Sequence, residues 1–180
     1  MNVFIAGARA ISVLDKPVQD RLNNIYRKGY TVLVGDAAGV DSAVQKYFSK
    51  LDYRNVFVYA SEGKARNNHG SWEVRGIDVP DRLRGFNYYA VKDKAMADDA
   101  DYGYMIWNGE SKGTLNNVVN LLKQDKNSLV YLTSEGLSYN IENIDNLQEL
   151  VLLCSRGAQS LYAKMCNDLA SKSLEQFTFY

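Results

Sequence analysis

Three glycine-containing turns carry the residue types that could bind a phosphorylated ligand. The first is AGARA (6–10), in which Gly7 permits a sharp turn and Arg9 can reach across the edge of a sheet. The second is GDAAGVDSAV (35–44), and the third is GESKGTLNNV (109–118). Each of these two follows an apolar run and precedes a helix-like run. Glycine permits close backbone approach, and the free N–H groups at the start of a helix favour an anion.

The second and third turns share one pattern: Gly, an acidic residue, two variable residues, Gly, four residues and then Val. Neither turn is a Walker A loop, and Gly7 lacks the two partner glycines of the dinucleotide fingerprint. We therefore predict one nucleotide pocket formed by three loops rather than a single-loop motif. The predicted nucleotide-binding residues are Gly7, Arg9, Gly35, Asp36, Gly39, Asp41, Gly109, Ser111, Lys112, Gly113, Thr114 and Asn117.

The elements that must position these turns alternate along the chain. Short apolar runs predict strands at 2–7, 30–35, 55–60, 102–107 and 129–133. Amphipathic runs predict helices at 15–29, 40–51, 88–100 and 114–125. This alternation predicts an α/β fold with a doubly wound, Rossmann-like parallel sheet of about five strands. Ligands bind such sheets beyond the carboxyl ends of the strands, so we expect the three turns to meet at one edge.

Two segments fall outside this alternation. Residues 61–87 show no sustained period and include Arg66, Arg75, Arg82 and Arg84, so we expect a functional lid or a flexible segment. Trp72, within this segment, could stack on a base or belong to the core. We assign residues 1–135 to a nucleotide-binding domain and 136–180 to a helical C-terminal extension. The extension could pack on the domain or form a homodimer contact, and the sequence leaves both open.

The composition limits the class of partner. Lys+Arg and Asp+Glu number 21 each in 180 residues, so the formal net charge is zero. Proteins that bind nucleic acid without sequence preference usually carry a basic excess, so we do not expect a nucleic-acid partner. One His and two Cys give no metal-ligand set, and no cofactor is predicted. The N-terminal residues do not form a signal peptide and no apolar run is long enough to span a bilayer, which predicts a cytoplasmic protein without a membrane partner.

Taken in order, four segments resemble the SLOG superfamily of Rossmann-like nucleotide-binding proteins, especially its small bacterial and phage members. The segments are FIAGARA, VLVGDAAGVD, KDKAMADDAD and MIWNGESKGTLNN, and the similarity covers about residues 1–135. The resemblance implies a pocket for a nucleotide or a nucleotide-derived molecule, with Arg9 at its mouth. It also implies that phosphate is held by Gly109, Ser111, Gly113 and Thr114, next to a wall formed by Gly35, Asp36 and Gly39.

Some members of this superfamily, the LOG phosphoribohydrolases, release a base from a nucleoside monophosphate. Their loop reads G-G-x-G-T-x-x-E, and its Glu acts together with an Arg on the preceding helix. In this chain Asn117 occupies the position of that Glu, and Lys92 the position that resembles the Arg. Glycosidic cleavage requires a carboxylate, which an amide cannot replace. The candidates for a substitute carboxylate are Asp36, Asp41, Asp93 and Glu110.

Three functions follow from these residues. The first is binding or sensing of a nucleotide or nucleotide-derived small molecule. The alternative is an N-glycoside-processing enzyme, similar to a phosphoribohydrolase or a deoxyribosyltransferase, with a relocated carboxylate. The second alternative is single-stranded DNA binding, against which the zero net charge argues, although the arginines of 61–87 could supply a local groove.

Overall fold

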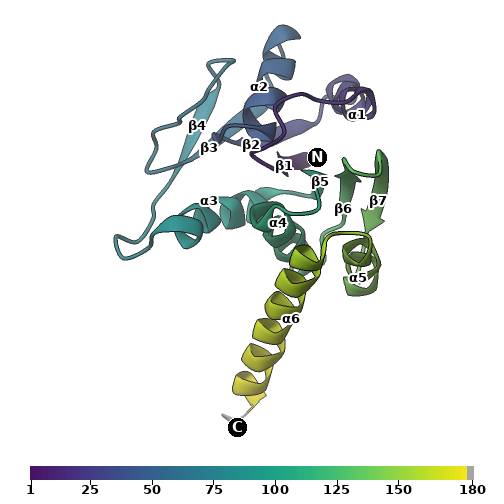
Figure 1. Cartoon of the computed structure of the whole chain (residues 1–180). Helices are drawn as coiled ribbons and strands as arrows, with labels where there is room; N and C mark the ends of the chain where they lie inside the picture. The colour runs from purple at the N-terminus through teal and green to yellow at the C-terminus, as the bar shows by residue number, and fades with distance from the viewer. Residues whose placement is uncertain (178–180) are drawn as a thin grey trace.

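The computed structural model describes the backbone of residues 1–177 and the side chains of residues 1–166. The last three residues of the predicted C-terminal extension lie outside the described residues. The described chain is an α/β fold with one sheet of seven strands and six helices (Figure 1). The strands are β1 (Asn2–Gly7), β2 (Thr31–Gly35), β3 (Val56–Ser61), β4 (Glu73–Ile77), β5 (Tyr102–Trp107), β6 (Ser128–Leu132) and β7 (Leu137–Ile141). The helices are α1 (Lys16–Arg27), α2 (Val40–Lys50), α3 (Gly85–Asp99), α4 (Lys112–Leu122), α5 (Ile144–Leu152) and α6 (Arg156–Phe177).

The order of the strands defines a doubly wound sheet. It runs β4-β3-β2-β1-β5-β6-β7, and all neighbours are parallel except β6 and β7. From β1 the chain first builds outward through β2, β3 and β4, and then returns to the other side of β1 with β5. The loops after β1 and β5 therefore diverge in opposite directions. This switch point is where open α/β sheets leave room for a ligand.

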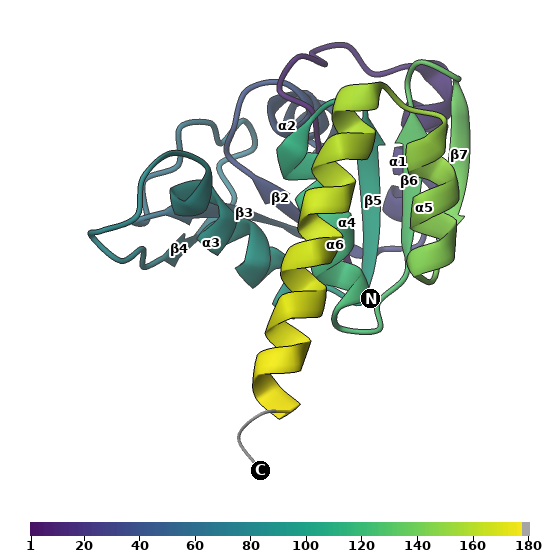
Figure 2. The same cartoon turned by 60° about the horizontal axis from the view of Figure 1, so that its bottom comes forward.

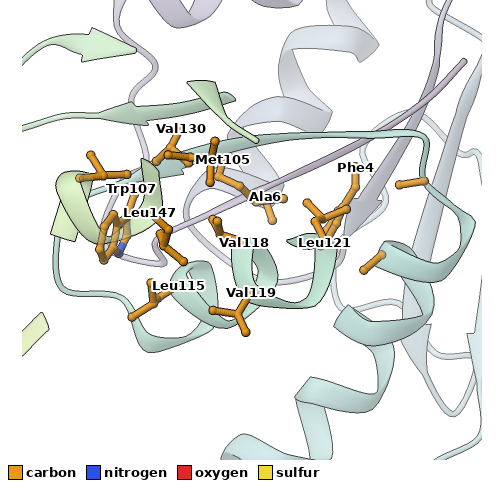
Figure 3. Close-up of a cluster of buried hydrophobic side chains, with 14 of the residues drawn as sticks. Phe4, Ala6, Met105, Trp107, Leu115, Val118, Val119, Leu121, Val130 and Leu147 are labelled. Atoms are coloured by element: carbon orange, nitrogen blue, oxygen red, sulfur yellow. The ribbon is translucent and has the colours of Figure 1, made fainter. Parts of the chain in front are cut away.

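Helices cover both faces of the sheet because its central strands are apolar throughout (Figure 1). On one face, Val18 and Leu22 of α1 and Phe48 of α2 pack in a buried cluster with the odd-numbered side chains of β1. On the other face, a second cluster joins β1 and β5 to α3, α4 and α5. Figure 3 shows part of it, with Trp107 beside Leu115 and Leu147. The two cores hold the carboxyl ends of β1, β2 and β5 in fixed register.

The predicted number of strands is too low. The described residues contain seven, and the two that the prediction lacks are β4 and β7. β4 lies inside 61–87, where we expected a lid or a flexible segment. Both are edge strands with mostly half-exposed or exposed residues, so neither shows the apolar run of a central strand.

The segment after residue 135 contributes β7 to the sheet and α5 and α6 to one of its faces. Leu147, Leu150 and Val151 of α5 and Ala158 of α6 belong to the buried cluster on that face. Figure 2 shows α6 crossing in front of α4, and both views show its C-terminal half projecting beyond the sheet. Among the described residues, none of the helices combines the length and the apolar character needed to cross a membrane.

Candidate functional site

A cavity of about 400 Å³ lies at the switch point of the sheet. Its wall is built from the loops after β1, β2 and β5 together with one side of α3 and the start of α4. The lining residues are Ala6, Gly7, Ala8, Arg9, Ala10, Ala37, Asp41, Arg66, Phe86, Tyr89, Lys92, Asp93, Met96, Asn108, Glu110, Ser111, Gly113 and Asn117. A smaller cavity of about 170 Å³ shares Arg66 and Tyr89 with it, so these two side chains form the wall between the cavities.

Two glycines allow the close backbone packing around the cavity. A Cβ on Gly7 would lie 2.3 Å from the Ile106 carbonyl oxygen and 2.6 Å from Val40, so only glycine lets β1 end against β5 and α2. A Cβ on Gly35 would lie 2.3 Å from Asp41 Oδ2 and 2.8 Å from Lys92 Nζ. Because Gly35 has no side chain, these two charged groups can occupy the space next to its Cα.

Charged and amide side chains form the inner end of the cavity. Asp41, Lys92 and Asn117 are 7%, 3% and 3% exposed, and Lys92 Nζ donates to Asp93 Oδ1 at 2.9 Å. Burial raises the pKa of Asp41 to about 6, although the Lys92 charge opposes the shift. Burial lowers the pKa of Lys92, but the Asp93 and Asp41 charges outweigh it and raise the pKa above its usual value. Lys92 is thus an ammonium that these two carboxylates stabilise.

Arg66 is held at the outer part of the cavity by Asp36. Its Nε and Nη2 donate to the two carboxylate oxygens at 2.8 and 2.7 Å, and its backbone N–H donates to the same group at 3.1 Å. Burial alone would raise the pKa of Asp36, but the Arg66 hydrogen bonds and the nearby Lys92 and Arg66 charges hold it below its usual value. This bidentate pair fastens the loop after β3 to the end of β2.

The outer wall places cations on aromatic rings. The Arg9 and Arg66 guanidinium carbons lie 4.9 and 4.8 Å from the centre of the Tyr89 ring. Lys112 Nζ lies 4.1 Å from the centre of the Phe86 ring. These rings come from the N-terminal part of α3, whereas Arg9 and Arg66 come from the loops after β1 and β3 and Lys112 is the first residue of α4. In the described part of the chain Arg9 has no ion pair, so its charge is available to a ligand.

The start of α4 is organised by its own side chains. Asn108 Oδ1 accepts hydrogen bonds from the backbone N–H groups of Glu110 and Ser111, at 3.1 and 3.0 Å. Ser111 Oγ caps the helix and accepts from the backbone N–H of Thr114 and from its hydroxyl, at 3.3 and 3.0 Å. The N–H groups of Lys112 and Gly113 are the first two of the helix and have no acceptor within it. They and the Ser111 hydroxyl remain as donors near the cavity.

The structure brings six of the twelve predicted binding residues to the cavity surface: Gly7, Arg9, Asp41, Ser111, Gly113 and Asn117. The other six lie beside it. Gly35 and Gly39 pack against Asp41 and Arg9, which line the cavity. Asp36 binds Arg66, and Gly109 forms the turn before α4. Lys112 stacks on Phe86, and Thr114 is buried within the helix cap rather than on the cavity surface. Whether these residues bind a nucleotide stays a prediction.

Several lining residues were absent from the predicted set. Phe86, Tyr89, Lys92 and Asp93 all come from α3, which approaches the cavity from a part of the chain outside the three turns. The run GFNYY at 85–89, three aromatics next to an arginine-rich segment, is the sequence signal that could have identified Phe86 and Tyr89, whereas Lys92 and Asp93 were named only as the counterpart of the LOG arginine and as a candidate carboxylate. Asp41, Asp93 and Glu110, three of the four candidate carboxylates, line the cavity.

Two further side chains of 61–87, Arg75 and Trp72, have structural positions. Arg75 donates to Tyr59 and Asp99 and stacks on Phe57. Trp72, which could have been a stacking platform, is buried and donates from Nε1 to the Tyr53 carbonyl at 2.7 Å. Trp107 is buried as well. Of the four arginines in 61–87, only Arg66 lines the cavity. No group of three or more His, Cys, Asp or Glu side chains among the described residues could hold a metal ion.

Comparison with known proteins defines the class of fold. No family model matches the chain, and no curated protein matches it in sequence. The fold itself has a counterpart among solved structures, a DNA-processing protein. That structure is DNA processing protein A from Helicobacter pylori, with a TM-score of 0.57 and 14% identity over 93% of this chain and 81% of the other. At this identity the likeness shows the fold alone.

The comparison corrects one prediction. We did not expect a nucleic-acid partner, but DNA processing protein A binds single-stranded DNA on a fold like this one. The prediction rested on the zero net charge of the whole chain. Bulk charge does not describe a local surface, since cations can gather at one edge of the sheet and acids elsewhere.

Proposed function

We propose that the protein binds single-stranded nucleic acid along the carboxyl edge of its sheet, with one nucleotide at the cavity. The observation that carries the proposal is the outer wall, where Arg9, Arg66 and Lys112 lie on the rings of Tyr89 and Phe86. Proteins that bind single strands combine cations that follow the backbone with aromatic rings on which bases stack. Such cation–ring pairs supply both contacts in one place.

The local charge supports this proposal better than the net charge does. Arg9 carries no acidic partner in the described structure, and the free N–H groups at the start of α4 add a favourable dipole for a phosphate. The two cavities meet at Arg66 and Tyr89. Both cavities therefore lie along the same edge of the sheet. DNA processing protein A, which binds single-stranded DNA on a similar fold, adds support, as does the SLOG resemblance.

A second candidate function is capture of a free nucleotide or nucleotide-derived molecule. The observation in its favour is the shape of the site, since the cavity of about 400 Å³ is concave and ends in buried polar side chains. A free nucleotide would use the same cations for its phosphate. The two candidates differ in whether affinity grows with strand length.

The test is a fluorescence anisotropy titration with a labelled oligothymidine of about 20 nucleotides, a length that exceeds the usual site size per domain. We expect saturable binding that weakens with salt, and weaker competition from duplex of the same length. Tyr89→Ala should weaken binding about tenfold, since one base–aromatic stack contributes about 1–3 kcal/mol. Arg9→Ala should weaken binding and flatten the salt dependence by about 0.7 in the logarithmic slope.

Lys112→Ala has a matched control on the same helix. Lys123 is an exposed lysine at the far end of α4, so Lys123→Ala removes the same charge away from the cavity. We expect Lys112→Ala to weaken binding and Lys123→Ala to leave it unchanged. Equal effects of the two variants, or no binding of the oligonucleotide at low salt, would refute single-strand binding at this edge. Binding of mononucleotides as tightly as of the oligonucleotide would favour the second candidate.

A further inference from the structure

The depth of each lining residue divides the cavity into two ends. Asp41, Lys92 and Asn117 are almost fully buried and mark the inner end. Arg9 and Glu110 are exposed and mark the mouth, together with Arg66, whose side chain is 41% exposed. Arg9, the lining cation without an ion pair in the described structure, therefore lies at the mouth. A ligand that enters the cavity contacts the mouth first and the inner end second.

The charge of the inner end excludes a phosphate there. Two carboxylates, Asp41 and Asp93, accompany the single ammonium of Lys92. Both Asp41 Oδ2 and Lys92 Nζ lie within 3 Å of the position of a Cβ on Gly35, at 2.3 and 2.8 Å, so they occupy one small volume. A phosphate placed here would meet a net negative charge in a poorly solvated space. At the mouth it would meet Arg9 and Arg66, and the acid there, Glu110, is exposed to solvent.

The inner end also has more hydrogen-bond acceptors than its protein neighbours use. Asp41 Oδ2 accepts from the Ala37 N–H at 3.2 Å, and Asp93 Oδ1 accepts from Lys92, which leaves the second oxygen of each carboxylate without a donor in the described structure. Asn117 Oδ1 is buried without any hydrogen-bond partner. A buried acceptor without a donor is destabilising, and a donor on a ligand relieves that cost. Acceptors from three helices, α2, α3 and α4, thus line the same cavity without protein donors in the described part of the chain.

We propose that the inner end of this cavity binds an uncharged group that carries two adjacent hydrogen-bond donors, with the phosphate of the same ligand left at the mouth. The inference rests on the proposed function and deepens it, because it names the part of the nucleotide that enters the cavity. Two parts of nucleotides have this chemistry: the Watson–Crick edge of guanine, with its ring N–H and amino group, and the cis-diol of ribose. Asp41, Asp93 and Asn117 are the residues that determine this specificity.

Four mononucleotides separate the two sources of donors. GMP carries both the guanine edge and the cis-diol, dGMP only the guanine edge, AMP only the cis-diol, and dAMP neither. Calorimetric titration of the wild-type protein with each should show dAMP binding at least about tenfold more weakly than GMP, since a good bidentate pair discriminates by about 1–3 kcal/mol. The ranks of dGMP and AMP then identify which donor pair enters. Equal affinity for all four, or no binding of any at millimolar concentration, overturns the inference.

Matched variants connect the preference to the inner end. Asp41→Asn keeps the size and removes a charged acceptor, so it should reduce the GMP preference over dAMP to below about threefold. Asp20→Asn makes the same change on α1, outside the cavity, and should leave the preference intact. Asn117→Leu, which leaves all charges in place, should also reduce the preference. A preference unchanged in both inner-end variants overturns the assignment.

The outcome of the mononucleotide titrations is independent of the outcome of the oligonucleotide titration. If the oligonucleotide binds but the four mononucleotides bind equally, the proposed function stands and this inference fails. If the oligonucleotide does not bind but GMP is preferred over dAMP, single-strand binding fails and the inner-end specificity stands, as a property of a free-nucleotide site.

Discussion

Replacing Lys92 with methionine should destabilise the protein at pH 8 and leave it nearly unchanged at pH 5. Methionine fills a similar volume, so the main change is the loss of the ammonium that the structure places beside Asp41 and Asp93. Asp41 then loses the charge that opposes the rise in its pKa. Removing one partner from a buried ion pair leaves the other charge uncompensated.

The magnitude follows from the pKa of Asp41, which burial raises to about 6 from 3.8 in the unfolded chain. Because the folded value is the higher one, folding takes up a proton between these values, and stability falls as the pH rises from about 3.8 to the folded pKa. In Lys92→Met the folded pKa rises further, so this loss of stability continues above pH 6. If the pKa reaches about 8, the extra cost at pH 8 is about 2 kcal/mol. At pH 5 Asp41 is mostly protonated in both proteins, and this cost disappears.

Urea denaturation of both proteins at pH 5 and pH 8 measures the difference. The double variant Lys92→Met/Asp41→Asn has no ionisable group at position 41, so it should lose most of the added pH dependence. The same destabilisation by Lys92→Met at both pH values would refute the reasoning, because it would show a loss of packing rather than of charge. Restoration of stability at pH 8 in the double variant, at least in part, is the positive result.

Two further changes test the walls of the site. Gly39→Ala should destabilise the protein by about 2 kcal/mol or more in urea denaturation, because its φ is +80° and a Cβ would lie 2.4 Å from the Arg9 carbonyl oxygen. Gly29→Ala, at φ +65° with open space around it, should cost only about 1 kcal/mol, and equal costs would contradict this account. Asp36→Asn should cost about 1 kcal/mol at pH 7, since Arg66 is partly exposed, and its loop should exchange amide hydrogens faster. The lowered pKa of Asp36 means that its contribution is present above pH 3.8 and is lost as the pH falls through the lower folded value, so an unchanged difference in strong acid would contradict it.

The central part of the fold could be predicted from sequence because burial there is two-sided. The expected strands at 2–7 and 102–107 coincide with β1 and β5. β4 and β7 could not be found in this way, since an edge strand satisfies half of its hydrogen bonds with one neighbour and keeps polar residues. Trp72 shows the opposite case, since it lies in a polar segment and yet packs in the core beneath the loop.

For the site, sequence reasoning located the loops, but of the helix that faces them it named only Lys92, through the family resemblance, and Asp93, as a candidate carboxylate. Turns that follow strands can be assigned to one edge because parallel strands share their direction. The side of α3 that faces the cavity cannot be assigned in the same way. It places Tyr89 and Lys92, three residues apart, on one surface, and its weak amphipathic pattern does not distinguish a ligand face from a core face. Only the packing of α3 against α4 and β3 makes that surface the wall of a cavity.

The zero net charge of the chain does not describe how charge is distributed between the inner end and the mouth of the cavity. Equal numbers of acids and bases would weaken binding to a polyanion if they were mixed on one surface. Here the acids Asp41 and Asp93 lie at the inner end, whereas the mouth carries Arg9 and Arg66 with one exposed acid, Glu110. A nucleotide has the complementary division, with a charged phosphate at one end and an uncharged, hydrogen-bonding base or sugar at the other. In the proposed site, the separation of charge along the cavity, rather than its sum over the chain, would therefore select both the ligand and the direction in which it enters.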